Sequence, residues 1–192
     1  GNGSAMRVSA VGWIFDDLDT VLKMASLSAT VSHDHPEAIK GAQATAAAIF
    51  LAKTRHTKEE IRNYIRENFY PLDQTLDEIR PEYEFTGSCQ GSVPQAIQAF
   101  LESKNYEDAL RNTISLGGDA DTMGAITGAI AWSFYRFQTK KGISIKMANM
   151  WIEAAEYLPE EWLDLVLEFD KLCRRREEAY VREGKAQRIR LE

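Results

Sequence analysis

Apolar residues recur every three or four positions along most of the chain, a spacing typical of amphipathic helices. Residues 36–53 are rich in alanine, which predicts a helix that packs closely against its neighbours. No segment alternates apolar and polar residues for long enough to predict a strand. The expected helices cover residues 16–29, 33–55, 56–68, 92–103, 105–116, 121–139, 145–157 and 159–184, with a short helix and long loops in residues 70–91.

Residues that favour helix N-termini stand at several of these expected starts, namely Asp16 or Asp17, Pro36, Thr57 and Asn105. Thr57 is followed three residues later by Glu60, the spacing of a capping box. Pro94 is expected in the first turn of its helix. The pattern therefore predicts an all-α bundle.

Composition narrows the class of protein further. The 192 residues are 44% apolar and 27% charged, which suits one domain over residues 1–192 with a single core. The net charge of −6 argues against nucleic-acid binding, because that function needs a concentrated basic face. No apolar run approaches the roughly 18 residues of a membrane span, and the N-terminus does not resemble a signal peptide. Cys89 and Cys173 are expected to be reduced thiols of a cytoplasmic protein that binds no membrane.

The segment "SLGGDADTMGAITGAIA", residues 115–131, carries the strongest chemical signal. Gly117 and Gly118 permit a sharp turn into a helix, and Asp121 suits the cap or the first turn. Asp119, Asp121 and Thr122 offer two carboxylates and a hydroxyl, the oxygen ligands that Mg²⁺ or Mn²⁺ select. The small residues that follow are expected to let other helices approach closely. The alternative is an N-cap aspartate whose acidic neighbour has no function.

Four blocks together resemble the ADP-ribosylglycohydrolase family, which includes dinitrogenase-reductase-activating glycohydrolase and the ADP-ribosyl-acceptor hydrolases. "GGDADTMGAITGAIA" resembles its C-terminal metal motif, and "GNGSAMRVSAVGW" its ligand loop. "SHDHPEAIKGAQATAAAIF" resembles its histidine-bearing helix start. "SCQGSVPQAIQAFLES" with "YEDALRNTISLGGDADT" resembles the approach to the metal site. The resemblance extends to about residue 137 and implies the orthogonal helix bundle of this family, incomplete at its N-terminus.

The resemblance also implies roles for particular residues. Asp119 and Asp121 would be catalytic and, with Thr122, would ligate a binuclear Mg²⁺ centre, with Mn²⁺ as an alternative. A loop around the ribose and diphosphate of ADP-ribose would be formed by Asn2, Gly3, Ser4 and Met6. His33 would reach the ADP-ribose, whereas His35 suits an N-cap. The substrate would be an ADP-ribosylated protein side chain or small molecule, cleaved at its glycosidic bond.

One part of the family's site is not found in these residues. The first metal motif, Thr-Asp-Asp, precedes the ligand loop, and residues 1–192 begin inside that loop. Three oxygen ligands are too few for two hard cations that take about six each. We therefore expect a part of a longer protein, a chain completed by a separate piece, or a remnant without activity. Apolar surface left by an incomplete bundle favours pairing with the missing N-terminal segment or self-association.

Three functions remain open from the sequence. The first is a Mg²⁺-dependent hydrolase, active alone or only with the missing segment. The second is a non-catalytic module that binds ADP-ribose or a nucleotide. The third is a structural protein that keeps the fold but does not use the pocket.

Overall fold

A computed structural model describes residues 1–136 and 145–182 of the chain, and every regular element within them is a helix. This confirms the expected all-α class. The chain forms two compact units, Gly1–Gln138 and Thr139–Glu192. The first unit contains α1 (Gly3–Met6), α2 (Ser9–Ile14), α3 (Leu18–Thr30), α4 (Pro36–Lys53), α5 (Lys58–Asn68), α6 (Leu76–Ile79), the 3₁₀ turn η1 (Arg80–Glu82), α7 (Cys89–Glu102), α8 (Tyr106–Leu116) and α9 (Ala120–Tyr135).

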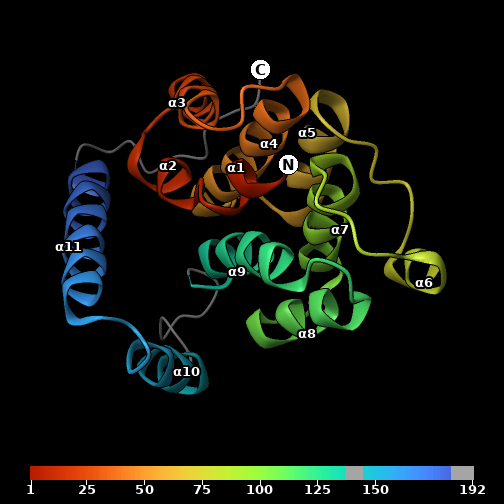
Figure 1. The fold of residues 1–192 in the computed structure, drawn as a ribbon. Coiled ribbons are helices and arrows are strands. Elements are labelled where there is room, and N and C mark those ends of the chain that lie inside the picture. The colour runs from red at the N-terminus through yellow and green to blue at the C-terminus, as the bar shows by residue number, and fades with distance from the viewer. Residues whose placement is uncertain (137–144, 183–192) are drawn as a thin grey trace. The chain divides into compact units, whose positions relative to one another are not determined.

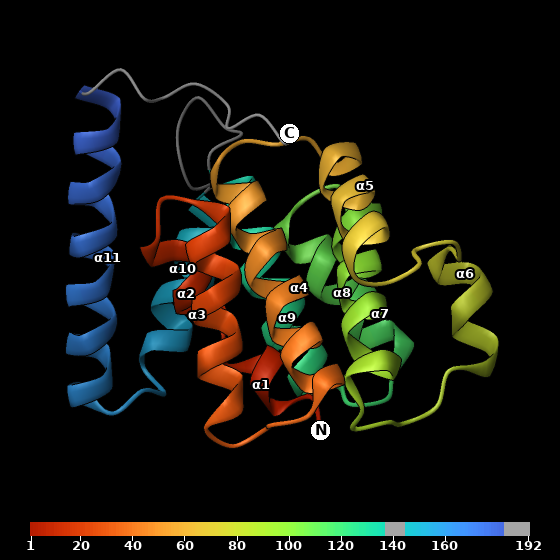
Figure 2. The same ribbon diagram turned by 90° about the horizontal axis from the view of Figure 1, so that it is seen from above.

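Helix α4 lies at the centre of the first unit. Figures 1 and 2 show it between α1–α3 on one side and α5 and α7 on the other, and it also packs against α9. From Ala44 to Ala52 every residue of α4 is buried, so this helix is enclosed on all sides. Its alanines keep the helix narrow, which permits this many neighbours. The alanine-rich segment is therefore the core element that the sequence predicts.

Local capping sets most of the helix starts where the sequence predicts them. The Asp17 carboxylate accepts a hydrogen bond from the Thr20 amide at 2.8 Å, and Asn105 caps α8 in the same way. At α5 the Thr57 side chain and Glu60 form both halves of a capping box. Each of these bonds joins residues three positions apart, so sequence alone is sufficient to find them.

Replacing Thr57 with alanine is expected to lower the free energy of unfolding by about 0.5–2 kcal/mol. The change removes the hydroxyl that accepts from the Glu60 amide at 3.2 Å. It also loosens the start of α5, where the Lys58 ammonium donates to the Phe100 carbonyl at the end of α7. Urea denaturation measures the loss. Thr30→Ala is the control, because among the contacts described this exposed threonine bonds only the Leu27 carbonyl. Equal urea midpoints for the two variants would contradict the capping role of Thr57.

Helices α7 and α9 are among those whose boundaries differ from the sequence prediction. Helix α7 begins at Cys89 rather than at residue 92, because the Ser88 side chain caps it by accepting from the Gly91 amide at 3.2 Å. Pro94 therefore lies inside the helix, where it has no N–H to donate to the carbonyl of Gln90, an exposed residue. Helix α9 begins at Ala120 and ends at Tyr135, and the expected extension over residues 137–139 lies outside the described residues.

The small residues of α9 do not all serve close packing. Apart from the nearby backbone of α9 itself, no described atom lies within 4 Å of a Cβ built on Gly124, and at Gly128 the nearest such contact is an ordinary 3.4 Å. The tight helix contacts occur elsewhere in the first unit. A Cβ on Gly12 of α2 would lie 2.6 Å from Ile49 Cγ2, and one on Gly41 of α4 would lie 2.5 Å from Cys89 Sγ. The expectation of close approach was therefore wrong for Gly124.

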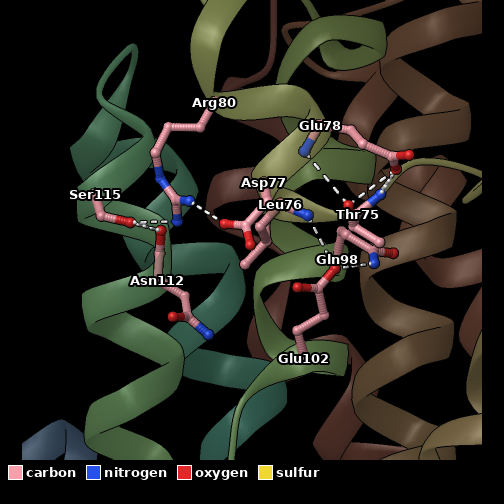
Figure 3. Close-up of polar contacts among 9 residues, drawn as sticks. All are labelled: Thr75, Leu76, Asp77, Glu78, Arg80, Gln98, Glu102, Asn112 and Ser115. Atoms are coloured by element: carbon pink, nitrogen blue, oxygen red, sulfur yellow. Dashed lines mark hydrogen bonds and ion pairs between the residues drawn. The ribbon is translucent and has the colours of Figure 1, made fainter.

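The short helix α6 is fixed to α7 and α8 by polar contacts (Figure 3). The Glu102 carboxylate on α7 accepts from the Leu76 amide at 2.9 Å and from the Gln98 side chain at 2.6 Å. The Arg80 guanidinium pairs with Asp77 at 2.5 Å and donates to the Ser115 hydroxyl on α8 at 3.1 Å. These contacts hold the start of the segment that leads from η1 to α7.

The second unit contains α10 (Ile145–Ala155) and α11 (Glu160–Arg182), the two helices that the sequence predicts there. The predicted end of the last helix at residues 183–184 falls outside the described part of the chain. Among the described residues, no helix is both long and apolar enough to cross a membrane.

Candidate functional site

The site begins at a turn between α8 and α9. Gly117 and Gly118 have φ angles of +76° and +68°, values that favour glycine over residues with a side chain. Asp119 follows as the N-cap residue of α9, yet within the described structure its side chain makes no capping hydrogen bond. Asp121 lies in the first turn, as predicted. The turn therefore leaves the Asp119 carboxylate available for contacts across the site.

The two carboxylates lie close together at the start of α9. The side-chain hydrogen bond between Asp119 and Asp121 is the largest cause that holds the pKa of Asp121 below its usual range, and the backbone amides of Thr122 and Asp121 add to it. Asp119 is half-buried and Asp121 is exposed. Two acidic groups within hydrogen-bonding reach of each other, one of them facing solvent, are a suitable pair of ligands for a hard cation.

Residues at the N-terminus, distant in sequence from this acidic pair, contact it in the fold. The Asn2 side chain donates to Asp119 Oδ2 at 2.6 Å and to the Ser92 hydroxyl at 3.1 Å. Thr122 Oγ1 lies 3.6 Å from the sulfur of Met6, and Thr122 is only 6% exposed. The structure thus brings Asn2 to Asp119 and Met6 to Thr122, two of the three proposed metal ligands.

The expected loop over residues 2–6 is instead a helical turn, α1. The Asn2 carbonyl accepts from the amides of Ala5 and Met6 at 3.0 and 3.1 Å, which closes the turn. Ser4 lies inside it, buried, and its hydroxyl donates to the Ala38 carbonyl on α4 at 2.9 Å. Ser4 therefore fixes α1 to α4, whereas Asn2 and Met6 point toward α9.

His33 lies beside the start of the chain, next to Gly1 and Gly3. A Cβ on Gly3 would lie 2.9 Å from His33 Nε2, so the absence of a side chain at residue 3 makes room for the ring. The Ser32 hydroxyl lies 2.8 Å from His33 Nδ1 and also accepts from Arg7 at 2.6 Å. These contacts orient the half-buried imidazole. Gly3 and His33 are therefore neighbours.

His35 has a different place. Its Nδ1 accepts from the Glu37 amide at 3.2 Å at the start of α4, which is the N-cap role that the sequence favours. Among the described contacts, Arg7 bonds the Ser32 hydroxyl and the Ser28 carbonyl. The Arg7 guanidinium therefore supports the serine beside His33.

Sequence reasoning missed Tyr83, which lies next to the acidic turn. Its hydroxyl donates to the Gly91 carbonyl at 2.7 Å and lies 3.0 Å from the sulfur of Met123. Burial, with a smaller effect from the negative charge of Asp119, raises the pKa of Tyr83 to about 12. Tyr83 belongs to the segment read as loops, where no periodic pattern marks a single aromatic residue as important.

The oxygen atoms offered by Asp119, Asp121 and Thr122 are of the type that a hard cation binds, but they are few. Among the described residues, no three His, Cys, Asp or Glu side chains gather as a metal-binding group. Asp119, Asp121 and Thr122 supply oxygens at one helix start, and further ligands must come from water, substrate or other residues. The arrangement can therefore contribute one side of a metal site.

Comparisons with known proteins point to one family. The profile of the ADP-ribosylglycohydrolase family matches residues 1–188. The chain is 30% identical over 181 residues to the ADP-ribosylhydrolase ARH3 of Mus musculus, a match covering 70% of this chain and 49% of that protein. It is 25% identical over 193 residues to the ADP-ribosylarginine hydrolase Tri1 of Pseudomonas putida (strain GB-1), covering 90% of this chain and 48% of that protein.

A solved structure described as an ADP-ribosylglycohydrolase-related protein complex shares the fold, with a TM-score of 0.63 and 24% sequence identity. That match covers 90% of this chain and 58% of the other. The chain spans about half the length of the curated relatives that it matches. Since the family profile covers nearly all of the sequence, from its first residue to residue 188, the chain belongs to the ADP-ribosylglycohydrolase family.

Proposed function

We propose that this chain carries the ADP-ribose-binding part and one side of the metal site of a Mg²⁺-dependent hydrolase. The reaction is hydrolysis of the glycosidic bond between ADP-ribose and a protein side chain or small acceptor. The hydrogen bond from Asn2 to Asp119 at 2.6 Å carries the proposal. It joins the segment assigned to ADP-ribose with the segment assigned to the metal, although 117 positions separate them in sequence.

Each residue would have a distinct role. Asp119, Asp121 and Thr122 would hold Mg²⁺, with Mn²⁺ as a substitute, and the bound ion would polarise the ribose hydroxyls and lower the pKa of water. Asn2 orients the Asp119 carboxylate through its hydrogen bond. His33, held by Ser32, presents Nε2 beside Gly1 and Gly3, where it would contact ADP-ribose.

Hydrolysis by this arrangement would need more ligands than residues 119–122 supply. Two hard cations take about twelve ligands between them, and three come from this helix start. We propose that a Thr-Asp-Asp segment outside residues 1–192 contributes others, with water and the ribose diol. The name of the Mus musculus relative, an ADP-ribosylhydrolase, and that of the bacterial relative, an ADP-ribosylarginine hydrolase, support this choice of reaction.

Titration calorimetry of the chain with ADP-ribose tests the proposal. We expect binding in excess Mg²⁺ to be at least about tenfold tighter than in EDTA, because an ion held by Asp119, Asp121 and Thr122 would supply positive charge that attracts the ribose hydroxyls. Free ADP-ribose should also be released from an ADP-ribosylated peptide in Mg²⁺ once a Thr-Asp-Asp segment is supplied. Release is followed by chromatography, with EDTA as the control.

The same titration separates the alternatives. Equal affinity in Mg²⁺ and in EDTA would contradict the metal site and favour a non-catalytic ADP-ribose-binding module. The hydrogen bond from Asn2 is compatible with such a module, because it already occupies one oxygen of the Asp119 carboxylate that would otherwise be available to a metal ion. An absence of binding in both buffers would leave a structural protein.

A further inference from the structure

Tyr83 lies against the backbone of the turn that precedes Asp119. A Cβ built on Gly118 would lie 2.7 Å from Tyr83 Cε1 and 3.4 Å from Cζ, so the ring occupies the space that a side chain at residue 118 would need. The φ angle of +68° at Gly118 also disfavours any residue other than glycine. The turn and the ring are thus matched in shape.

The phenol is itself held at both of the helices it touches. Its hydroxyl donates to Gly91 in the first turn of α7 and lies 3.0 Å from the sulfur of Met123 in the first turn of α9. Asn2 joins the same two helix starts, through Ser92 on α7 and Asp119 at α9. Two side chains from distant segments therefore fix the start of α9 relative to the start of α7.

The backbone that carries Tyr83 has its own support. The contacts of Figure 3 fix α6 and η1 to α7 and α8, through Glu102 on one side and the Arg80–Ser115 hydrogen bond on the other. Tyr83 is the first residue after η1. Its ring thus extends from a fixed segment onto the glycine turn.

The turn needs such a support because of its composition. Gly117 and Gly118 are consecutive glycines with wide conformational freedom, and a Cβ built on Gly117 would meet none of the described atoms within 4 Å. The Asp119 side chain makes no capping bond to the backbone of α9 within the described structure, and its hydrogen bonds run to the side chains of Asn2 and Asp121. Contact with the Tyr83 ring restricts the turn before any ligand arrives, which reduces the ordering cost of binding.

We propose that Tyr83 is a positioning residue, which holds the Gly117–Gly118 turn and so directs the Asp119 carboxylate into the site. Its consequence for Mg²⁺-dependent ADP-ribose binding rests on the proposed function, whereas its effect on the turn does not. The ring contacts the turn at Gly118, and the hydroxyl holds the ring in place through its hydrogen bond to Gly91.

The test compares Tyr83→Ala and Tyr83→Phe in the full chain with Tyr64→Ala, a control at another half-buried tyrosine, on α5. Amide ¹H–¹⁵N spectra report on the turn, and calorimetry with ADP-ribose in excess Mg²⁺ reports on binding. Tyr83→Ala should shift or broaden the amide signals of Gly118 and Asp119 and weaken binding by about three- to tenfold. Tyr83→Phe keeps the ring but loses the hydroxyl contacts, so it should come much closer to the unaltered chain than Tyr83→Ala in both measurements, and Tyr64→Ala should change neither. If Tyr83→Ala does not fold, Tyr83→Leu takes its place, since it keeps an apolar side chain but lacks the flat ring.

The outcomes distinguish this inference from the proposed function. Unchanged Gly118 and Asp119 signals in Tyr83→Ala would overturn the positioning role, as would equal weakening of binding by Tyr64→Ala. If the unaltered chain shows no Mg²⁺-dependent binding while Tyr83→Ala still disturbs these two signals, the proposed function fails and the role of Tyr83 in the turn stands.

Discussion

Asp119→Asn and Asp121→Asn are each expected to abolish the tightening of ADP-ribose binding by Mg²⁺, so that affinity in excess Mg²⁺ falls to the value in EDTA. A hard cation is held by charge as much as by oxygen count, and an amide oxygen carries no net charge. The two carboxylates lie within reach of each other at one helix start, so either loss leaves a single charged ligand. Calorimetry with ADP-ribose in each buffer measures the effect.

The substitutions are expected to leave the fold intact. The amide oxygen introduced by Asp119→Asn can still accept the hydrogen bond from Asn2. Asp121 is exposed, so its replacement opens no cavity. Loss of a negative charge near the N-terminus of α9 lowers stability by about 0.3–1 kcal/mol through the helix dipole. A loss of ADP-ribose-binding free energy greater than this loss of stability therefore reports on the site rather than on unfolding.

A matched control is available on α3. Asp19 is exposed and is the second residue of its helix, the position that Asp121 has on α9. Asp19→Asn should reproduce the small dipole effect on stability and leave Mg²⁺-dependent binding unchanged. If Asp121→Asn and Asp19→Asn behave alike in both measurements, Asp121 is only a favourable charge at a helix start, and the metal assignment is wrong.

The features that sequence could predict are those fixed by local interactions. The caps at Asp17, Thr57 and Asn105 use bonds between residues three positions apart, so their helix starts were confirmed. The acidic pair is local in the same sense, since Asp119 and Asp121 are separated by one residue. Ser88 was missed as the cap of α7 because Pro94 suggested a later start.

The features that sequence could not predict depend on segments distant along the chain. Nothing near Asn2 indicates that its amide bonds Asp119, and nothing near Tyr83 indicates that its ring covers Gly118. Their meeting depends on how α1, α7 and α9 pack, which helical periodicity does not specify. The family resemblance supplied Asn2 as a site residue but gave no sign of Tyr83.

The packing around glycines also depends on segments that are distant in sequence, so the local sequence does not predict it. Gly124 lies in a segment of small residues and was expected to admit a neighbouring helix, yet apart from the nearby backbone of α9 itself no described atom approaches its Cβ position within 4 Å. Gly12 has no such context but lies against α4. Whether a glycine is required for packing depends on its partner helix, and the partner is set by the tertiary fold.

Gly12→Ala is therefore expected to destabilise the protein, by about 1–3 kcal/mol. The added methyl would lie 2.6 and 2.7 Å from Cγ2 and Cβ of Ile49 and 2.8 Å from the Ala46 carbonyl oxygen. Ile49 is fully buried and the carbonyl belongs to the central helix, so neither can move away without cost, and α2 must shift from α4.

Gly124→Ala provides the opposite case within the same chain. It adds the same methyl group inside a helix, but without a described neighbour within 4 Å, and alanine favours the helix by about 0.5–1 kcal/mol over glycine. Urea denaturation should therefore move the midpoint down for Gly12→Ala and up for Gly124→Ala, with unchanged slopes. Midpoints that rise for both variants would mean that α2 and α4 are not in close contact at Gly12. Helix α2 follows directly after α1, so a shift of α2 should also move Asn2. Gly12→Ala should therefore weaken ADP-ribose binding. Gly124→Ala should not change the position of Asn2.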